Sequence, residues 1–350
     1  MASLTNQGDF PYDVQFPSRG ILPPDFKAWG SASARAHKDR VNAVGWSNDG
    51  KRLGSVSSDK SLRIWPEKAL DSGRPDAKMA TAMIGHSDKV VQLAWHPLDS
   101  NLLTTVSLDK TIRCWDIRAR APTTTLQLSS AAYNLAYHPD GQTLAAGAET
   151  IGFYDLRHPT GPQRTIERQQ QADRINHDFR WSKDGELFTI CCNDGSFEAY
   201  LYPSFELEFS DKGHTSDATK IEFTKDRRYM LTGGGDAVVN VWDLEEWICL
   251  RSINQIEGLV RSISVNSISE CVAIGTDDRN ISIASIHTGE TLHSFKTGAK
   301  TKSLAWHPSK LLLAYASEDI TREEHMREPG MMNISSSVRV WGKGVGRPSA

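Results

Sequence analysis

Short apolar segments that end in an aromatic or β-branched residue recur along the chain at a nearly constant interval. The end points are Trp46, Trp95, Tyr137, Trp181, Phe223, Val265 and Trp306. A second strand follows each of them, and these strands end at Trp65, Trp115, Tyr154, Tyr200, Trp242, Ala284 and Trp341. Within such segments, for example Ser61–Trp65, apolar and polar residues mainly alternate between turn residues, which predicts strands rather than helices.

The interval between successive first-strand end points is 49, 42, 44, 42, 42 and 41 residues. A period of about 40–45 residues that is built from four short strands is typical of a β-propeller. Seven copies are present, so the sequence predicts an all-β fold, a seven-bladed β-propeller. Asp-Gly turns at Asn48–Gly50, Pro139–Gly141 and Lys183–Gly185 agree with this, because glycine tolerates the backbone angles of tight hairpin turns.

The two ends of the chain are expected to meet in the last blade. After Trp341 only Gly342–Ala350 follow, a stretch with few strand formers. We therefore predict that the segment around Lys27–Ala34 supplies the outer strand of the seventh blade, since an unclosed ring would expose a sheet edge. The predicted organisation is a flexible segment 1–26, one propeller over 27–342 and a flexible tail 343–350.

Three repeats carry a further polar pattern. A histidine lies nine residues before the first-strand end point, an aspartate lies six residues before a tryptophan, and a serine or threonine lies four residues before that aspartate. The sets are His37, Ser55, Asp59 and Trp65; His86, Thr105, Asp109 and Trp115; and His214, Thr232, Asp236 and Trp242. This spacing matches the structural tetrad of WD40 repeats, in which the four side chains form a chain of hydrogen bonds. Because the sets repeat at equivalent positions instead of converging on one cleft, we predict a structural role and no catalytic triad.

Composition and charge narrow the function classes. The chain has 40 Lys and Arg against 43 Asp and Glu, which gives a formal net charge of -3. A protein that binds nucleic acid mainly through the phosphates of the nucleic acid is usually basic, so the charge does not favour this function. It has no C-x-x-C pair, H-E-x-x-H motif, phosphate loop, secretory signal or long apolar span. We expect no enzymatic activity, no cofactor, no metal and no membrane contact, and five buried, reduced cysteines of an intracellular protein.

Departures from the repeat mark candidate binding sites, because loops carry binding while strands carry packing. In the seventh repeat 35 residues separate Trp306 from Trp341, against 17 to 20 in the other repeats, so about fifteen extra residues at 318–332 enter a loop on the predicted top face. The charged segment Thr321–Glu328 within it has two interpretations. We favour a surface insertion without fixed structure over a partner-binding element that forms a short helix.

Positive residues gather on the same predicted face over repeats seven, one and two. They are Arg40, Lys60, Lys89, Lys110, Lys300 and Lys302. A solvated rim is the common interpretation of such residues, and the alternative is a crescent that meets an acidic helix or a phosphate. Together with Arg322, Glu323 and Glu324 of the insertion, they form the predicted partner-binding set.

The order of several short segments along the chain identifies a family more specifically than any one of these segments alone. They are Val91–Pro97, Ser107–Arg118, Pro139–Ala145, Leu201–Pro203, Arg228–Gly233, Trp242–Arg251, Ser303–Pro308 and Leu312–Ala314. With this order, the degenerate third, fourth and sixth repeats and the insertion in the seventh, the chain resembles the WD40-repeat subunit of the THO/TREX complex, the THO complex subunit 3 family. The resemblance covers nearly the whole length after residue 30.

This resemblance implies a non-enzymatic scaffold in the nucleus, within an assembly that couples transcription to the packaging and export of messenger RNA. The implied partners are protein subunits, chiefly a large helical scaffold subunit, with RNA contact at most indirect or weak and no small-molecule substrate. Two alternatives stay open. One is a WD40 adaptor of another assembly, such as a ubiquitin-ligase substrate receptor or a ribosome-assembly factor, and the other is a direct RNA-binding module.

Overall fold

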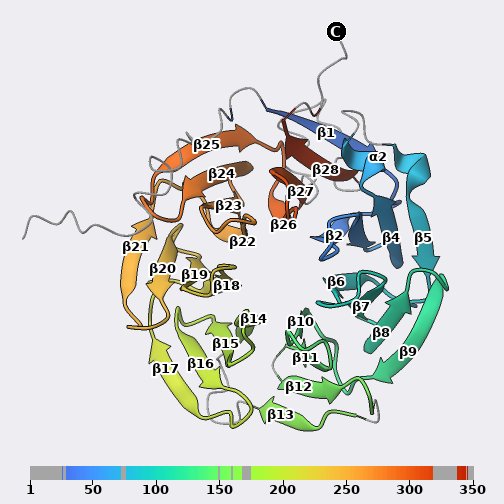
Figure 1. The fold of residues 1–350 in the computed structure, drawn as a ribbon, viewed down its shortest axis with the longest axis horizontal. Helices are drawn as coiled ribbons and strands as arrows, with labels where there is room; N and C mark the ends of the chain where they lie inside the picture. The colour runs from blue at the N-terminus through green and yellow to red at the C-terminus, as the bar shows by residue number, and fades with distance from the viewer. Residues whose placement is uncertain are drawn as a thin grey trace, which may run out of the picture.

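The computed structural model describes residue 26 and residues 29–71, 76–148, 150–158, 161–167, 175–317, 337–343 and 345. In this part of the chain seven four-stranded antiparallel sheets stand around a common axis, with the first strand of each blade innermost (Figure 1). The predicted seven-bladed all-β propeller is confirmed. The predicted segment 1–26, apart from Phe26, and most of the predicted tail 343–350 lie outside the described residues.

The first four blades follow one another along the chain. Blade 1 contains β2 (Val41–Trp46), β3 (Arg52–Ser57), β4 (Ser61–Pro66) and β5 (Thr81–Ile84). Blade 2 contains β6 (Val90–Trp95), β7 (Leu102–Ser107), β8 (Thr111–Asp116) and β9 (Ala121–Gln127). Blade 3 contains β10 (Asn134–Tyr137), β11 (Thr143–Gly147), β12 (Thr150–Asp155) and β13 (Arg164–Glu167). Blade 4 contains β14 (Asn176–Trp181), β15 (Leu187–Cys192), β16 (Phe197–Leu201) and β17 (Leu207–Asp211).

The last three blades complete the ring. Blade 5 contains β18 (Ala218–Phe223), β19 (Tyr229–Gly234), β20 (Val239–Asp243) and β21 (Cys249–Ile253). Blade 6 contains β22 (Val260–Val265), β23 (Cys271–Thr276), β24 (Asn280–Ser285) and β25 (Thr291–Lys296). Blade 7 contains β26 (Thr301–Trp306), β27 (Leu312–Ser317), β28 (Ser337–Gly342) and β1 (Gly30–Arg35). Between β4 and β5 lie the short helices α2 (Lys68–Asp71) and η2 (Ala77–Met79).

The second strand that the sequence marks in each repeat is the third strand of its blade. In blade 1, Trp46 at the end of β2 pairs with Leu53 of β3, and Leu53 pairs in turn with Trp65 of β4. The strand between them carries no aromatic end point, so its position did not stand out in the sequence. Gly50 in the first turn has a φ of 72°, which explains why glycine follows aspartate there.

The N-terminal strand β1 is the outer strand of blade 7. Its residues pair antiparallel with β28 from Gly30–Gly342 to Arg35–Ser337. Aromatic packing stabilises this edge of the blade. The ring centroids of Trp29 and Phe295 lie 4.6 and 4.8 Å from the ring centroid of Trp341. Phe26 is 4% exposed and packs on both Trp29 and Trp341. The ring is therefore closed by hydrogen bonds and by apolar burial together.

Apolar clusters fill the spaces between neighbouring blades. One cluster combines Val41 and Leu53 of blade 1 with Val338 and Val340 of blade 7, all fully buried. Leu70 of α2, also fully buried, joins the same cluster, so part of the longer connection in blade 1 belongs to the core. Each blade thus depends on its neighbours for burial, as expected for radially packed sheets.

Histidines join neighbouring blades at the face opposite the predicted top face. The ring of His307 in blade 7 donates from Nε2 to the carbonyl oxygen of Gly50 in blade 1 at 3.0 Å, and His138 does the same to Gly185 of blade 4 at 3.2 Å. A Cβ atom added to Gly50 would lie 2.3 Å from the His307 ring, so the glycine is required for this close approach as well as for its φ.

Candidate functional site

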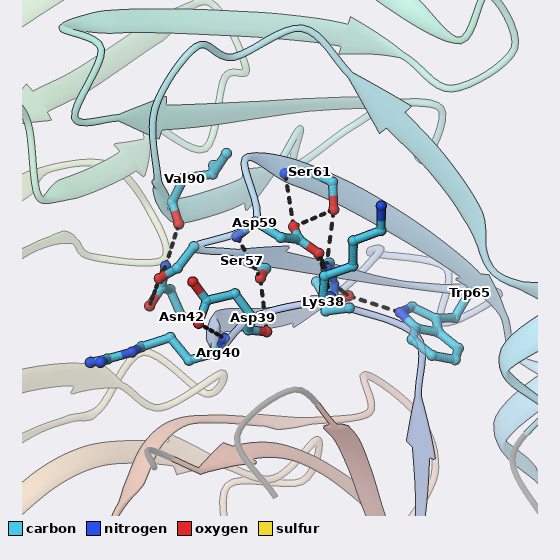
Figure 2. Close-up of polar contacts among 12 residues, drawn as sticks. Lys38, Asp39, Arg40, Asn42, Ser57, Asp59, Ser61, Trp65 and Val90 are labelled. Carbon is cyan, nitrogen blue, oxygen red and sulfur yellow. Dashed lines mark hydrogen bonds and ion pairs between the residues drawn. The ribbon is translucent and has the colours of Figure 1, made fainter. Parts of the chain in front are cut away.

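The top face is defined here as the face that carries the loops before each first strand and between each second and third strand. In blade 1, His37 and Asp59 lie in two of these loops, whereas Ser55 lies in β3 and Trp65 in β4. The Trp65 indole donates from Nε1 to Ser55 Oγ at 2.9 Å, and Ser55 Oγ lies 2.8 Å from His37 Nε2. His37 Nδ1 lies 3.1 Å from Asp59 Oδ2, which also accepts from the backbone N–H of Lys38 at 2.8 Å. Figure 2 shows this chain running from Trp65 to the turn that contains Asp59.

Blades 2 and 5 repeat the arrangement with nearly the same distances. His86 Nε2 lies 2.8 Å from Thr105 Oγ1 and its Nδ1 lies 2.9 Å from Asp109 Oδ2. In blade 5 the distances from the His214 ring to Thr232 Oγ1 and Asp236 Oδ1 are 2.9 and 3.0 Å. The indoles complete each set, since Trp115 donates to Thr105 at 2.8 Å and Trp242 donates to Thr232 at 3.0 Å.

The indole of each tetrad can only donate, so the hydroxyl oxygen accepts from it. A carboxylate can only accept, so the ring nitrogen Nδ1 donates to the aspartate. The ring of every histidine in the three sets is buried. A saturated network of this kind holds two loops in one geometry and offers no nucleophile to a substrate.

The four other blades have no serine or threonine at the Ser55 position and no histidine nine residues before the first-strand end point. At the position of Ser55, strand register places Ala146 in blade 3, Ile190 in blade 4, Ile274 in blade 6 and Tyr315 in blade 7. Alanine and isoleucine have no hydroxyl, so these positions in blades 3, 4 and 6 cannot take part in such a network.

The pKa values of the buried pairs follow from this environment. Burial disfavours the imidazolium and lowers the pKa of His37 and of His86 below 6.5, although the paired aspartates act in the opposite direction. Burial alone would raise the pKa of Asp109, but hydrogen bonds from Thr111, from the Ser87 N–H and from His86 together lower it to about 2. The pKa of Asp59 is lowered in the same way by His37, Ser61 and the Lys38 N–H.

The lowered pKa values of these histidines and aspartates predict that the protein loses stability in acid. Below pH 6.5 the unfolded chain takes up protons on His37 and His86 that the folded chain does not bind, so the free energy of unfolding falls by up to about 1.4 kcal/mol per pH unit for each proton. Below about pH 4 the aspartates add a second loss. Urea denaturation at pH 7.5, 6 and 5 measures the first loss, and His86→Gln should make it shallower. Equal stability at pH 7.5 and 5 would contradict this prediction.

The predicted positive crescent divides into two groups in the structure. Arg40, Lys60, Lys89 and Lys110 are exposed on the top face of blades 1 and 2. Lys60 and Lys110 occupy the same left-handed position of their turns, with φ of 69° and 62°, directly after the tetrad aspartates. Asp39 accepts from the Arg40 backbone N–H at 2.7 Å, so its carboxylate is partly engaged by the loop (Figure 2).

The two lysines predicted on blade 7 differ from this exposed group. Lys300 and Lys302 are both half-buried. Lys302 lies on the innermost strand β26, and its Nζ donates to Asn42 Oδ1 at 3.1 Å. It therefore faces the propeller axis rather than the outer crescent. Arg322, Glu323 and Glu324, with the whole of the 318–332 insertion and its predicted short helix, lie outside the described residues.

The described residues were also compared with the expectations for cysteines, metal sites and membrane spans. All five cysteines carry free thiols. The expectation that all five are buried was wrong for Cys249, which is exposed at the start of the outer strand β21, and for the half-buried Cys114. Within the described ranges, no cluster of three or more His, Cys, Asp or Glu side chains is arranged to hold a metal ion. Over the same ranges, no helix is long and apolar enough to cross a membrane.

Comparison with known proteins places the chain among propellers. The family model described as the IFT122 first beta-propeller matches residues 30–285. THO complex subunit 3 of Arabidopsis thaliana is 33% identical over 296 residues, which covers 84% of this chain and 91% of that protein. WD repeat-containing protein AAC3 of Dictyostelium discoideum is 25% identical over 327 residues, covering 87% of this chain and 65% of its own length. WD repeat-containing protein 82 of Drosophila melanogaster is 26% identical over 257 residues, or 60% of this chain.

The comparisons agree with the fold. The match to the propeller family model extends over most of the chain, and the similarity to THO complex subunit 3 extends over nearly all of both proteins. The chain belongs to the β-propeller family that this model describes and to the THO complex subunit 3 family.

Proposed function

We propose that this protein is a non-enzymatic scaffold subunit of a THO complex in the nucleus, where it supports messenger ribonucleoprotein assembly and mRNA export. The observation that carries the proposal is the 33% identity to THO complex subunit 3, which runs through 91% of that protein. Residues 27–342 form the propeller unit in this proposal, and the segments 1–26 and 343–350 flank it.

The chemistry of the described residues supports a scaffold over an enzyme. Three buried histidine–aspartate pairs, which could suggest catalytic triads, belong to the three tetrads, two of which lie in adjacent blades while the third lies across the ring (Figure 1). A closed ring of sheets presents loops on two faces and changes shape little, which suits docking of a partner.

The partner that we propose is a large helical subunit of the complex, docked on the top face of blades 1 and 2. The four exposed cations Arg40, Lys60, Lys89 and Lys110 project from loops that the tetrads hold in place. These positive charges are complementary to an acidic helical surface. Because the loops that carry them are already held in one conformation, binding does not have to order them.

Affinity purification tests the function. We expect the tagged protein to recover a large helical THO subunit from nuclear extract, in the same amount with and without RNase, because the proposed contact is between proteins. Loss of that subunit on RNase treatment would instead favour a direct RNA-binding module. Recovery of ubiquitin-ligase or ribosome-assembly components in its place would overturn the proposal.

Charge reversal tests the docking face. The fourfold variant Arg40→Glu, Lys60→Glu, Lys89→Glu, Lys110→Glu should reduce recovery of the helical subunit about tenfold or more, because like charges then face each other. Quantitative mass spectrometry of the purified complex measures this change.

The matched control reverses four exposed cations in loops of the opposite face, namely Lys51, Lys78, Arg120 and Arg227. We expect this variant to recover the helical subunit normally. An equal loss in both variants would show that net charge, rather than the top face, controls assembly.

A further inference from the structure

Exposed apolar residues gather where the outer strands of blades 4 and 5 begin, toward the face opposite the top face. Leu207 at the start of β17 is 56% exposed, and Ile248, just before β21, is 53% exposed. β17 and β21 are the outermost strands of neighbouring blades in Figure 1. Phe209 of β17 and Trp247, both half-buried, stack across the two blades with ring centroids 4.7 Å apart. We call Leu207, Phe209, Trp247 and Ile248 the outer patch.

Trp247 occupies a turn position that favours glycine. Its φ is 52°, in the left-handed region that bulky residues rarely adopt. Gly289 holds the equivalent position in blade 6, since each of the two residues lies four residues after the end of the third strand, and the φ of Gly289 is 75°. Strained backbone persists only where the surroundings hold it, and such positions cluster at functional surfaces. The turn of blade 5 therefore carries a cost in backbone strain for an indole ring at the outer patch.

Carboxylates surround the outer patch. Two acidic residues flank Leu207 and two others precede Trp247, and all four are exposed. They are Glu206, Glu208, Glu245 and Glu246. The segments 204–210 and 243–250, which carry the outer patch, contain no lysine or arginine. An apolar centre with an acidic border is thus presented to solvent.

A groove of about 250 Å³ opens beside the outer patch, between blades 4 and 5. Leu244 lines the groove and packs against the same apolar cluster as Phe209 and Trp247. Carboxylates outnumber guanidinium groups among the lining residues, which include Asp184, Glu186, Asp243 and Glu245 against Arg227 and Arg228. The groove therefore extends the acidic border of the patch with both arginines taken into account.

We propose that the outer patch and this groove bind a basic segment of a partner protein, one that carries lysine or arginine beside apolar residues. Its apolar side chains cover Leu207 and Ile248, and its cations meet the surrounding carboxylates. A second copy of this chain is a poorer match, because a two-fold interface would place one acidic border against the other. The surface lies opposite the top-face cations of blades 1 and 2, so it does not depend on the protein's place in a THO complex.

Fluorescence anisotropy of a labelled peptide with alternating lysine and leucine, titrated with the purified full chain, tests the proposal. We expect saturable binding that weakens as salt is raised, and no binding of a peptide with alternating glutamate and leucine. The double variant Leu207→Ser, Ile248→Ser should bind the lysine–leucine peptide about tenfold more weakly, because the apolar contact is lost. The double variant Glu245→Lys, Glu246→Lys should weaken binding by a similar factor through repulsion between like charges.

Two matched controls change the same residue types elsewhere. Ile84→Ser with Leu98→Ser removes apolar side chains that are 75% and 69% exposed, and Glu257→Lys with Glu290→Lys reverses two exposed glutamates of blade 6. Both control proteins should bind the peptide like the unmodified chain.

Three outcomes would overturn the proposal. One is that the unmodified chain does not bind the lysine–leucine peptide, and another is that the patch variants bind it as tightly as their controls. The third is self-association of the unmodified chain in sedimentation velocity that Leu207→Ser with Ile248→Ser abolishes, because the patch would then join two copies. None of these outcomes bears on recovery of the helical THO subunit, so the two proposals fail separately.

Discussion

Removal of residues 1–36 is expected to abolish cooperative folding of the whole propeller. The deletion takes away β1 and exposes the edge of β28, together with the Trp341 ring that Phe26 and Trp29 contact. Loss of a buried large aromatic side chain costs about 3–5 kcal/mol, and a domain has only about 5–15 kcal/mol in total. Near-ultraviolet circular dichroism should therefore show no sharp thermal transition, and the exposed edge should promote self-association on size-exclusion chromatography.

Two point variants separate the causes of this effect. Trp29→Ala leaves the backbone pairing of β1 in place and should lower the free energy of unfolding by part of the full amount. Ser33→Ala changes an exposed side chain of the same strand and should melt at the unmodified temperature. A truncated chain that melts like the full chain would show that β1 does not hold the ring closed.

His214→Ala is expected to lower the free energy of unfolding by about 1–3 kcal/mol without any other defect in the ring. The substitution leaves Thr232 and Asp236 without their imidazole partner in a buried site, and an unsatisfied buried polar group is costly. Urea denaturation measures the change. His158→Ala removes an exposed histidine and serves as the control, with no change expected.

A double-mutant cycle tests whether the tetrad acts as one network. His214→Ala and Asp236→Ala should be less destabilising together than the sum of the single effects, because both remove the same hydrogen bond at 3.0 Å. Additive effects, or a His214→Ala protein as stable as the unmodified chain, would contradict a structural role for the set.

Much of the fold could be predicted because its signals are local and repeated. The end points from Trp46 to Trp306 recur at one period, and each tetrad lies within 30 residues of one repeat, as from His86 to Trp115. The closing strand around Lys27–Ala34 followed from the physical cost of an open edge. The middle strand of each blade did not stand out, since strands such as β3 (Arg52–Ser57) carry no aromatic marker.

The cavity on the propeller axis, which Arg180, Lys220 and Lys302 help to line, was not predictable in the same way. Lys302, Lys220 and Arg180 precede their own end points by four, three and one residues, so no single repeat position marks all of them. Their approach depends on the ring geometry and, for Lys302, on a bulge that the periodicity does not reveal. The histidines after the end points, such as His138 and His307, did carry a signal. Their recurrence next to proline could have indicated contacts between blades.

Because β1 pairs with β28, the first strand of the propeller must wait for the last one during synthesis. About 300 residues separate them, which corresponds to roughly 15–60 s of translation at about 5–20 residues per second. Toward the end of that time the emerging chain holds six completed blades with two unpaired edges, and a cellular factor that shields such edges would have its greatest effect then. The yield of this protein should thus depend more on how fast the ribosome reaches the final codons than on the stability of any single blade.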